Sequence, residues 1–565
     1  MGVRRAMEMV LTEANKNEGP IYTYGPLIHN NQVMALLESK GVTSVDDIEG
    51  IQGGTLAIRA HGIPPGQRRL LKESGLRIID ATCPRVARVQ AIIRYQTKKG
   101  NTAIIVGDRD HPEVIGLLGY AGDRAYVINQ LDDVFHIPDG EKVFIVAQTT
   151  QDTRNYQEIV EAVTDRFPDA LIFHTICDAT INRQAEVRAF VGQVDAVVVV
   201  GGYHSGNTRR LAQISEAAGL PTFCVETEKD LDKERLFSME VIGVTAGAST
   251  PNWMIKNIVN EIETIRSRKE SFLGRWFKGA FKFMLLSNLL VALGGLALAY
   301  AVSVLCARMH DLVYPSLAFF YLYAMHVFNR FLDKDASTYN DPERASFYRK
   351  YRGFLIISAT VSMIASFALS YYQSTMTFFA ILGLSILGII YSIRILPIRP
   401  KRLWRYTKIK DIPGSKTLSV ALAWGVVITL LPLLVSSHTD WLVATISFIL
   451  VFSMVYARSA LFDIFQAQGD LFVGVETLPI VLGEKKTLFL LKGVILSGVL
   501  INATAGIFGL VGPFIYLLLF CLLSLGLSLL AYEKRWLYPG TRLEAIVESN
   551  FFFAGLLGLI WQILS

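Results

Sequence analysis

The sequence of 565 residues contains few cysteines, and they lie far apart. A small, odd number of widely spaced cysteines argues against a framework of disulfides and for a reducing compartment. No Cys-x-x-Cys pair occurs, so a zinc site of that type is not predicted. The five cysteines are Cys83, Cys177, Cys224, Cys306 and Cys521.

The sequence also lacks the marks of secretion and of nucleic-acid binding. Its first ten residues contain no apolar segment of the kind that a secretory signal carries. No segment interleaves basic with aromatic residues along a helix, and the net charge of +6 is modest. We therefore expect a cytosolic N-terminal half and no nucleic-acid partner.

The residues that are abundant divide the chain in two. Charged and apolar residues mix in the first half, whereas apolar runs of roughly 20 residues, enough to cross a bilayer as a helix, recur in the second. We expect a soluble domain over residues 1–266, a basic juxtamembrane linker over residues 267–282 and a transmembrane domain over residues 283–565.

Short β-branched runs alternate with amphipathic segments through residues 50–266. This alternation predicts an α/β domain with largely parallel sheets. Ligands of such domains bind beyond the carboxyl ends of the strands. The predicted strands are 56–59, 77–80, 103–106, 143–147, 171–174, 196–200 and 241–244.

Side chains able to do chemistry follow strand after strand. Each alone has an ordinary explanation as a hydrogen-bonded histidine, a small buried thiol or a helix cap. Their recurrence at one edge of the sheets favours a shared site instead. The selected residues are His29, His61, Cys83, His111, Glu113, Thr149, Cys177, Ser205, Gly206, Asn207 and Ser249.

The residue types at this edge favour an anionic ligand. Ser205, Asn207 and Thr208 open a predicted helix, whose free N–H groups and dipole attract phosphate. The three histidines, when protonated, would add donors for a diphosphate. Glu113 is the one carboxylate among them and is the natural proton donor.

Cys83 and Cys177 stand at predicted strand ends, and the Cys83-Pro84 step is common at iron–sulfur ligands. The first half of the chain resembles the 4-hydroxy-3-methylbut-2-enyl diphosphate reductases, in unbroken order over residues 1 to about 265. The matching segments are Ala-Thr-Cys-Pro-Arg-Val (81–86), His-Pro-Glu (111–113), Ala-Gln-Thr-Thr (147–150), Cys-Asp-Ala-Thr-Ile-Asn-Arg-Gln (177–184), Gly-Asn-Thr-Arg-Arg-Leu (206–211) and Thr-Ala-Gly-Ala-Ser (245–249).

The resemblance implies a trefoil of three α/β modules around a [4Fe–4S] cluster held by three cysteines. It also implies an activity that removes a hydroxyl as water, with two electrons from a donor such as ferredoxin or flavodoxin, and yields isopentenyl and dimethylallyl diphosphate. By this resemblance Cys83 and Cys177 are cluster ligands and Glu113 donates the proton. The implied substrate-binding residues are His29, His61, His111, Thr149, Ser205, Gly206, Asn207 and Ser249.

The sequence departs from that family at two places. Gly206 stands where the family often has a second serine, so one side-chain contact to the diphosphate is missing. The family carries its first cluster cysteine in a Gly-Phe-Cys-x-Gly-Val segment, whereas this sequence opens with Met1-Gly2-Val3. Either the start was placed too late, or the domain has lost one ligand and has little activity. We favour the first alternative because the remaining site residues are in place.

Nine apolar spans are predicted in the second half, which gives an all-α transmembrane domain. Lys and Arg gather in alternate loops, so these loops and the N-terminal domain are expected on the cytosolic side of an inner membrane. The spans are roughly 283–305, 312–331, 353–372, 375–396, 415–435, 440–463, 487–509, 511–531 and 547–564.

Polar side chains gather near the ends of two of these spans. Spacings of three and four residues place each group on one helix face. Facing acidic helix ends can hold Mg²⁺, which in turn holds a diphosphate. Ordinary caps at the membrane interface are the alternative. The two groups are Asn329, Asp333 and Ser337, and Asp463, Gln466 and Asp470.

Residues 280–565 resemble the UbiA intramembrane prenyltransferases, which carry acidic motifs after their second and sixth helices. This chain keeps Asn329, Asp333, Asp463 and Asp470 of those motifs, and Lys416 is placed to pair with a phosphate. Three acidic positions are replaced, by Arg330, Ser337 and Gln466. The resemblance implies Mg²⁺, a prenyl diphosphate, an unidentified acceptor and the lipid bilayer as partners.

Together the two halves predict a membrane-bound bifunctional enzyme. One alternative is that the membrane half is a non-catalytic anchor or scaffold for a working reductase. The other is that the reductase half is a binding module without a cluster, and the membrane half is the seat of activity.

Overall fold

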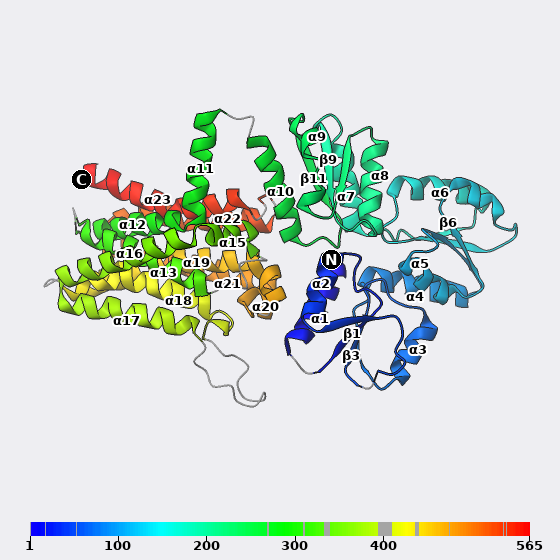
Figure 1. The fold of residues 1–565 in the computed structure, drawn as a ribbon, viewed down its shortest axis with the longest axis horizontal. Helices are drawn as coiled ribbons and strands as arrows, with labels where there is room; N and C mark the ends of the chain where they lie inside the picture. The colour runs from blue at the N-terminus through cyan, green and yellow to red at the C-terminus, as the bar shows by residue number, and fades with distance from the viewer. Residues whose placement is uncertain are drawn as a thin grey trace. The chain divides into compact units, whose positions relative to one another are not determined.

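The chain divides into two units, Met1–Glu270 and Ser271–Ser565 (Figure 1). All of the described strands lie in the first unit, and the described elements of the second are helices. The computed structural model describes residues 2–16, 19–51, 53–267, 271–308, 311–332, 340–393, 409–435, 440–473, 475–534, 536–537 and 540–564.

The first sheet of unit one is parallel and has the order β2-β1-β3-β4. Its strands are β1 (Ile21–Tyr24), β2 (Val42–Val45), β3 (Thr55–Ile58) and β4 (Arg77–Asp80). The helices that accompany it are α1 (Gly2–Lys16), α2 (Asn31–Ser39), α3 (Pro65–Glu73) and α4 (Pro84–Lys98).

The second sheet is also parallel, with the order β6-β5-β7-β8. Its central strands are buried along their whole length, which explains their continuous apolar sequences. The strands are β5 (Thr102–Val106), β6 (Ala125–Ile128), β7 (Val143–Ala147) and β8 (Leu171–Ile172). The helices are α5 (Pro112–Ala121), the 3₁₀ turn η1 (Leu131–His136), α6 (Thr153–Arg166) and α7 (Asp178–Ala189).

The third sheet is parallel as well, with the order β10-β9-β11. Its strands are β9 (Ala196–Val200), β10 (Thr222–Val225) and β11 (Ile242–Ala246). Its helices are α8 (Gly206–Ala217), η2 (Glu228–Asp230), α9 (Lys233–Phe237) and α10 (Asn252–Ser267). The predicted α/β class with parallel sheets is therefore confirmed, and the sheets are three in number.

Two helices join neighbouring sheets through shared apolar cores. Val89 and Ile93 of α4, which follows the first sheet, pack with Ile105 of β5 in the second. Val187 of α7, which follows the second sheet, packs with Val197 of β9 in the third. Burial of these apolar faces holds the three sheets together, because each linking helix covers the sheet that comes next in the chain.

The seven predicted strands correspond to β3, β4, β5, β7, β8, β9 and β11 of the structure. The segment 171–174 forms only the two-residue strand β8, and β1, β2, β6 and β10 were not predicted. Of these missed strands, β2, β6 and β10 are edge strands that are only partly buried. Strands β1 and β2 also precede residue 50, where the predicted alternation begins.

Unit two is a helical bundle around one large apolar core that includes Trp424, Met454 and Phe551. Its first helices are α11 (Phe272–Leu286), α12 (Leu289–Leu305), α13 (Val313–Leu332), α15 (Pro342–Lys350), α16 (Arg352–Gln373) and α17 (Thr375–Ser392). They are followed by η3 (Ile409–Asp411), α18 (Ser415–Gly425), the π turn η4 (Val426–Leu430), the 3₁₀ turn η5 (Leu431–Leu434), α19 (Trp441–Val473), α20 (Leu478–Leu482), α21 (Glu484–Ile507), α22 (Phe514–Glu533) and α23 (Thr541–Leu564).

The predicted count of nine transmembrane helices is not exact. In the described part of the chain, seven helices are long and apolar enough to cross a membrane, or eight if α11 and α12 form one bent span. These two helices meet at 75° next to Asn288, whose backbone is left-handed (φ 63°). Helix α13 is not among the seven, and its polar residues Tyr314, His326 and Arg330 lower its mean hydropathy. The predicted linker 267–282 includes residues 272–282 of α11.

Close packing of α8 against the ends of β9 and β11 leads to a first prediction. A methyl group on Gly247 would overlap the buried hydroxyl of Thr208. We expect Gly247→Ala to lower the free energy of unfolding of unit one by about 1–3 kcal/mol, since the buried site has no free volume. Urea unfolding followed by pulse proteolysis, scored for cleavage within residues 1–270, measures this. Gly66→Ala, where no atom lies within 4 Å of the new methyl, is the matched control and should be neutral or slightly stabilising.

Candidate functional site

Three histidines from two sheets lie together at the carboxyl ends of the strands. His29 follows β1, His61 follows β3 and His111 follows β5. The ring centroids of His29 and His61 are 5.1 Å apart, those of His61 and His111 are 5.3 Å apart, and those of His29 and His111 are 6.3 Å apart. The structure thus brings together three residues that are separated by up to 82 positions, as the strand-end pattern predicted.

The third sheet contributes a loop and a helix start to the same place. An ideal Cβ on Gly202 would lie 2.5 Å from the carbonyl oxygen of His29, so the loop after β9 runs directly against that residue. An ideal Cβ on Gly206, the first residue of α8, would lie 3.3 Å from His111 Nε2. The start of α8 therefore faces the histidine cluster.

His111 is oriented by the helix that follows it. Its Nδ1 accepts a hydrogen bond of 3.1 Å from the backbone N–H of Glu113, as an N-cap of α5. A neutral imidazole that accepts at Nδ1 carries its proton at Nε2. That proton is directed toward Gly206 and the N-terminus of α8, where an anion would be favoured by the free N–H groups.

The histidines are held in their neutral form in this structure. Burial lowers the pKa of His111 to about 4 and lowers the pKa of His61 well below its ordinary value. The pKa of His29 is lowered by burial, by the charges of Arg59 and Arg209 and by His204. The site without a ligand therefore holds neutral imidazoles, and protonated donors stay a prediction for the site with a diphosphate bound. A diphosphate placed among them would act in the opposite direction, because a nearby negative charge raises a histidine pKa.

Glu113 is a buried carboxyl at the same place, with 2% of its surface exposed. Its two oxygens accept hydrogen bonds from the backbone N–H of Thr149 at 2.7 Å and from the Thr149 hydroxyl at 2.9 Å. Burial raises its pKa to about 7, although both bonds from Thr149 act in the opposite direction. A carboxyl with this pKa holds a proton that it can release near neutral pH.

Several buried polar atoms around the start of α8 have no hydrogen-bond partner among the described residues. A native structure rarely leaves such atoms unsatisfied, so a polar ligand is the natural partner. Thr208 opens α8, but its sequence position alone does not predict a binding role, and only its burial distinguishes it. The atoms are His61 Nδ1, Asn207 Nδ2, Thr208 Oγ1 and Ser249 Oγ.

The two predicted cluster cysteines each precede a helix. Cys83 and Cys177 are the N-cap residues of α4 and α7, and an ion pair between Arg85 and Asp178 joins the starts of these helices. The backbone of Gly2 lies directly against Cys83 Sγ. In the described residues no group of three His, Cys, Asp or Glu side chains is arranged to hold a metal ion. The site therefore fits a [4Fe–4S] cluster only in part, with two of the three expected thiolates.

The membrane unit holds a second set of buried acidic side chains. Asp463 of α19 lies 3.3 Å from Lys416 Nζ and accepts a hydrogen bond of 2.5 Å from the Thr417 hydroxyl. Asp470 accepts a bond of 2.6 Å from the side-chain amide of Asn340, and Gly469 is needed there because any side chain would overlap Asn340.

The remaining predicted residues of this unit are placed as follows. Asn329 Oδ1 accepts a hydrogen bond of 3.3 Å from the Ser392 hydroxyl. Asp333 and Ser337 lie outside the described residues. Arg458 and Glu548, which form a buried ion pair between α19 and α23, were not predicted, since nothing in their spacing relates one to the other.

The raised pKa of Glu113 predicts how stability depends on pH. Its folded pKa of about 7 lies above its ordinary value of 4.5, so its protonated form stabilises the fold fully at low pH. This contribution is lost as pH rises toward 7 and above, in total about 3 kcal/mol. Glu113→Gln should remove that part of the pH slope, measured by pulse proteolysis of unit one in urea at pH 5.0 and 7.5. Glu158→Gln, an exposed change on α6, should keep the slope. An unchanged slope in Glu113→Gln would contradict the assignment.

Two family models match the chain. Residues 1–263 match the model described as LytB protein, and residues 288–556 match the UbiA prenyltransferase family. The 4-hydroxy-3-methylbut-2-enyl diphosphate reductase of Geotalea uraniireducens is 40% identical over 268 residues, which cover 47% of this chain and 95% of that protein. The reductase of Nitratidesulfovibrio vulgaris is 43% identical over 269 residues, 47% of this chain and 96% of that protein.

Solved structures of both kinds are similar to parts of the chain. The E-1-hydroxy-2-methyl-but-2-enyl-4-diphosphate reductase from Plasmodium falciparum is 32% identical, with 46% of this chain and 83% of that chain covered and a TM-score of 0.44. A UbiA homolog from Archaeoglobus fulgidus, bound to GPP and Mg²⁺, is 17% identical, with 50% and 98% covered and a TM-score of 0.38.

Each of the two family models matches one unit of the chain. The UbiA family domain and the apolar helices of unit two indicate a multi-pass membrane protein. Through residues 1–263, where curated relatives are matched over almost their whole length, the chain belongs to the 4-hydroxy-3-methylbut-2-enyl diphosphate reductase (LytB) family, and it carries a UbiA prenyltransferase family domain over residues 288–556.

Proposed function

We propose that this chain is a membrane-bound enzyme whose first unit reduces 4-hydroxy-3-methylbut-2-enyl diphosphate and whose second unit transfers a prenyl group. The observation that carries the first part is the meeting of His29, His61 and His111 with buried Glu113 and the start of α8. We propose the domain limits 1–266 and 283–565, with an inner-membrane location and the first unit in the cytosol.

The diphosphate would bind between the histidines and the N-terminus of α8. Asn207, Thr208 and Ser249 have buried donors there that no described residue pairs, and His61 and His111 add imidazole nitrogens. Gly206 offers only its backbone N–H, which allows the anion to approach closely. Thr149, proposed to bind substrate, also fixes Glu113 through two hydrogen bonds.

The reaction exchanges the substrate hydroxyl for hydrogen. The carbon–oxygen bond breaks, two electrons and two protons are taken up, and the oxygen leaves as water. Glu113 would supply a proton to this oxygen, because burial keeps its carboxyl protonated up to about pH 7. The electrons come from a donor such as ferredoxin or flavodoxin. Cys83 and Cys177 would provide two thiolates for a [4Fe–4S] cluster, one fewer than the three that the family resemblance implies.

In the second unit, Asp463 and Asp470 offer carboxylate oxygens of the kind that Mg²⁺ prefers, and Asp333 is proposed to join them. The ion would neutralise the diphosphate leaving group of a prenyl donor. Lys416 lies beside Asp463 and supplies a positive charge to the same diphosphate. The prenyl chain would lie among the apolar helices, with the acceptor unidentified.

A non-catalytic anchor is the second candidate for this unit. The observation that favours it is the pairing of Asp463 with Lys416 and Thr417, which already occupies the carboxylate. The replacement of three acidic motif positions, by Arg330, Ser337 and Gln466, points the same way. An anchor would bind prenyl diphosphates no better with Mg²⁺ than without it.

Metal content of two versions of the chain tests the reductase assignment. We expect a chain extended at its N-terminus by Gly-Phe-Cys to hold about four iron atoms and to reduce substrate, and the sequence as printed to hold fewer. Gly2 lies against Cys83 Sγ, so we expect a cysteine added ahead of Met1 to lie near Cys83. Iron, sulfide and activity are measured after anaerobic purification. Cys177→Ser should lower the iron content of the extended chain, whereas Cys224→Ser, in β10, should not. Equal iron and no turnover in both versions would contradict the reductase proposal.

Binding of geranyl diphosphate in the presence and absence of Mg²⁺ tests the prenyltransferase assignment. Asp463→Asn should weaken Mg²⁺-dependent binding by about tenfold or more, because a carboxylate ligand of the ion is lost. Asp440→Asn is the matched control, since Asp440 only caps α19 through its hydrogen bonds to the N–H groups of Leu442 and Val443. Binding that never depends on Mg²⁺, with prenyl transfer absent, would support the anchor instead.

A further inference from the structure

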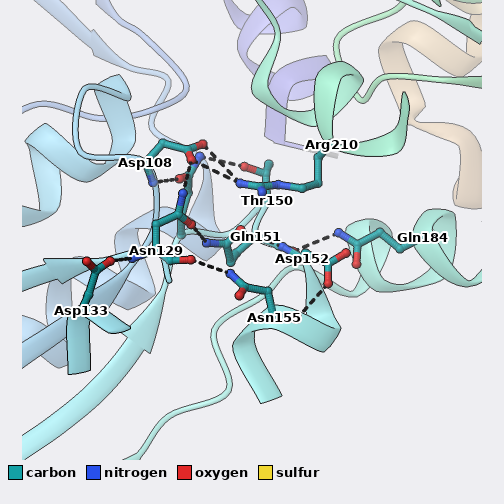
Figure 2. A network of polar contacts seen from close by, with 10 residues as sticks. Asp108, Asn129, Asp133, Thr150, Gln151, Asp152, Asn155, Gln184 and Arg210 are labelled. Carbon is teal, nitrogen blue, oxygen red and sulfur yellow. Dashed lines mark hydrogen bonds and ion pairs between the residues drawn. The ribbon is translucent and has the colours of Figure 1, made fainter. Parts of the chain in front are cut away.

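A polar network extends from the carboxyl edge of the second sheet to helix α8 (Figure 2). At its centre is Asp108, which comes two residues after the end of β5, beyond Gly107. The two oxygens of this carboxylate lie 3.3 and 3.4 Å from the guanidinium of Arg210 on α8. Neither residue belongs to the site described above.

The carboxylate of Asp108 is held in place before Arg210 reaches it. Its backbone N–H donates to Gln148 Oε1 at 3.0 Å, and its Oδ1 accepts from Asn129 Nδ2 at 3.1 Å. Asn129 is itself fixed, because its Oδ1 accepts from Gln151 at 2.8 Å and its N–H donates to Asp133 at 2.8 Å (Figure 2). Because Asp108 is already held in place, its ion pair with Arg210 loses less side-chain conformational entropy on forming than a pair of two mobile surface side chains.

The backbone of Asp108 is also hydrogen-bonded to the backbone of His111, one member of the histidine cluster. Its carbonyl oxygen accepts a hydrogen bond of 2.9 Å from the N–H of His111. On the other side, Arg210 stands four residues after Gly206, so the two share a face of α8. Gly206 is the residue that lies beside His111 Nε2. One residue, Asp108, thus connects to both sides of the space in which a diphosphate would bind.

We propose that Arg210 is a positioning residue for diphosphate binding, and that its ion pair with Asp108 sets the distance between the N-terminus of α8 and the imidazole of His111. This inference rests on the proposed diphosphate site and names a further residue that makes it. An anion can accept from His111 Nε2 and from the N–H groups of α8 together only if both lie within hydrogen-bond distance of it. A helix free to shift by about an ångström would satisfy one set of donors or the other.

A purely electrostatic effect of the Asp108 charge and a positioning role of the ion pair predict opposite effects of Asp108→Asn on anion affinity. If charge alone mattered, Asp108→Asn would strengthen anion binding, because it removes a negative charge near the site. Positioning predicts weaker binding, because the ion pair that holds α8 is lost while the acceptor for Asn129 is kept.

The experiment measures the affinity of the full chain, in detergent, for inorganic pyrophosphate by calorimetry, which requires neither the cluster nor turnover. We expect Arg210→Met and Asp108→Asn each to weaken binding about fivefold, and the double variant to be no weaker than either one. Arg210→Lys should restore part of the affinity. In the reductase assay, carried out on the chain extended by Gly-Phe-Cys, the single variants should raise KM and leave kcat nearly unchanged.

Arg188→Met is the matched control. Arg188 pairs with Asp152 at 2.7 Å in the same region, but this pair joins α7 to the start of α6 and does not reach α8. The affinity of Arg188→Met for pyrophosphate should equal that of the unchanged chain. Near-equal unfolding midpoints of all variants would exclude a general loss of structure.

The outcomes separate this inference from the proposed reductase activity. Tighter binding by Asp108→Asn, additive effects in the double variant, or an equal loss in Arg188→Met would each overturn the positioning role. Absence of pyrophosphate binding by the unchanged chain would also overturn it. Loss of binding in both single variants, in a chain that never reduces substrate even when extended by Gly-Phe-Cys, would support the positioning role and reject the reductase activity.

Discussion

The parallel direction of all three sheets is the constraint on which the site in unit one depends. Parallel strands bring their carboxyl ends to one edge, so residues that follow β1, β3 and β5 meet although they are far apart in sequence. The linking helices α4 and α7 each cover the next sheet in the chain, which holds the edges in a fixed relation. The histidine cluster is a direct consequence of this topology.

Burial then determines the chemistry of the groups that meet there. The same loss of water that keeps the histidines neutral keeps a proton on Glu113 near pH 7. Within the described part of the chain, the donors of Asn207 and Ser249 have no hydrogen-bond partner, which costs stability in a fold without a ligand and favours a polar ligand there. In unit two Asp463 is buried too, but Lys416 already forms an ion pair with it and the Thr417 hydroxyl donates a hydrogen bond to it.

Most of the first unit could be predicted because its central strands are buried on both faces and read as continuous apolar runs, such as 196–200. The edge strand β6 could not be predicted, because only its last residue is fully buried and its sequence shows no clear alternation. In the membrane unit, hydropathy located the helices but not their exact number. Polar side chains lower the mean hydropathy of α13, and the bend at Asn288 separates α11 from α12, so the number of apolar stretches differs from the number of spans.

The sequence by itself determined the two-part organisation, the parallel α/β class and the choice of His29, His61, His111 and Glu113, because these follow from local patterns and from motifs in fixed order. Only the tertiary structure decided which nitrogen of His111 faces α8, how far burial shifts the pKa of Glu113 and that Arg210 meets Asp108. The reason is physical. Hydrogen-bond direction, desolvation and ion pairing depend on distances between residues that the chain separates by up to 102 positions, and no local pattern encodes those distances.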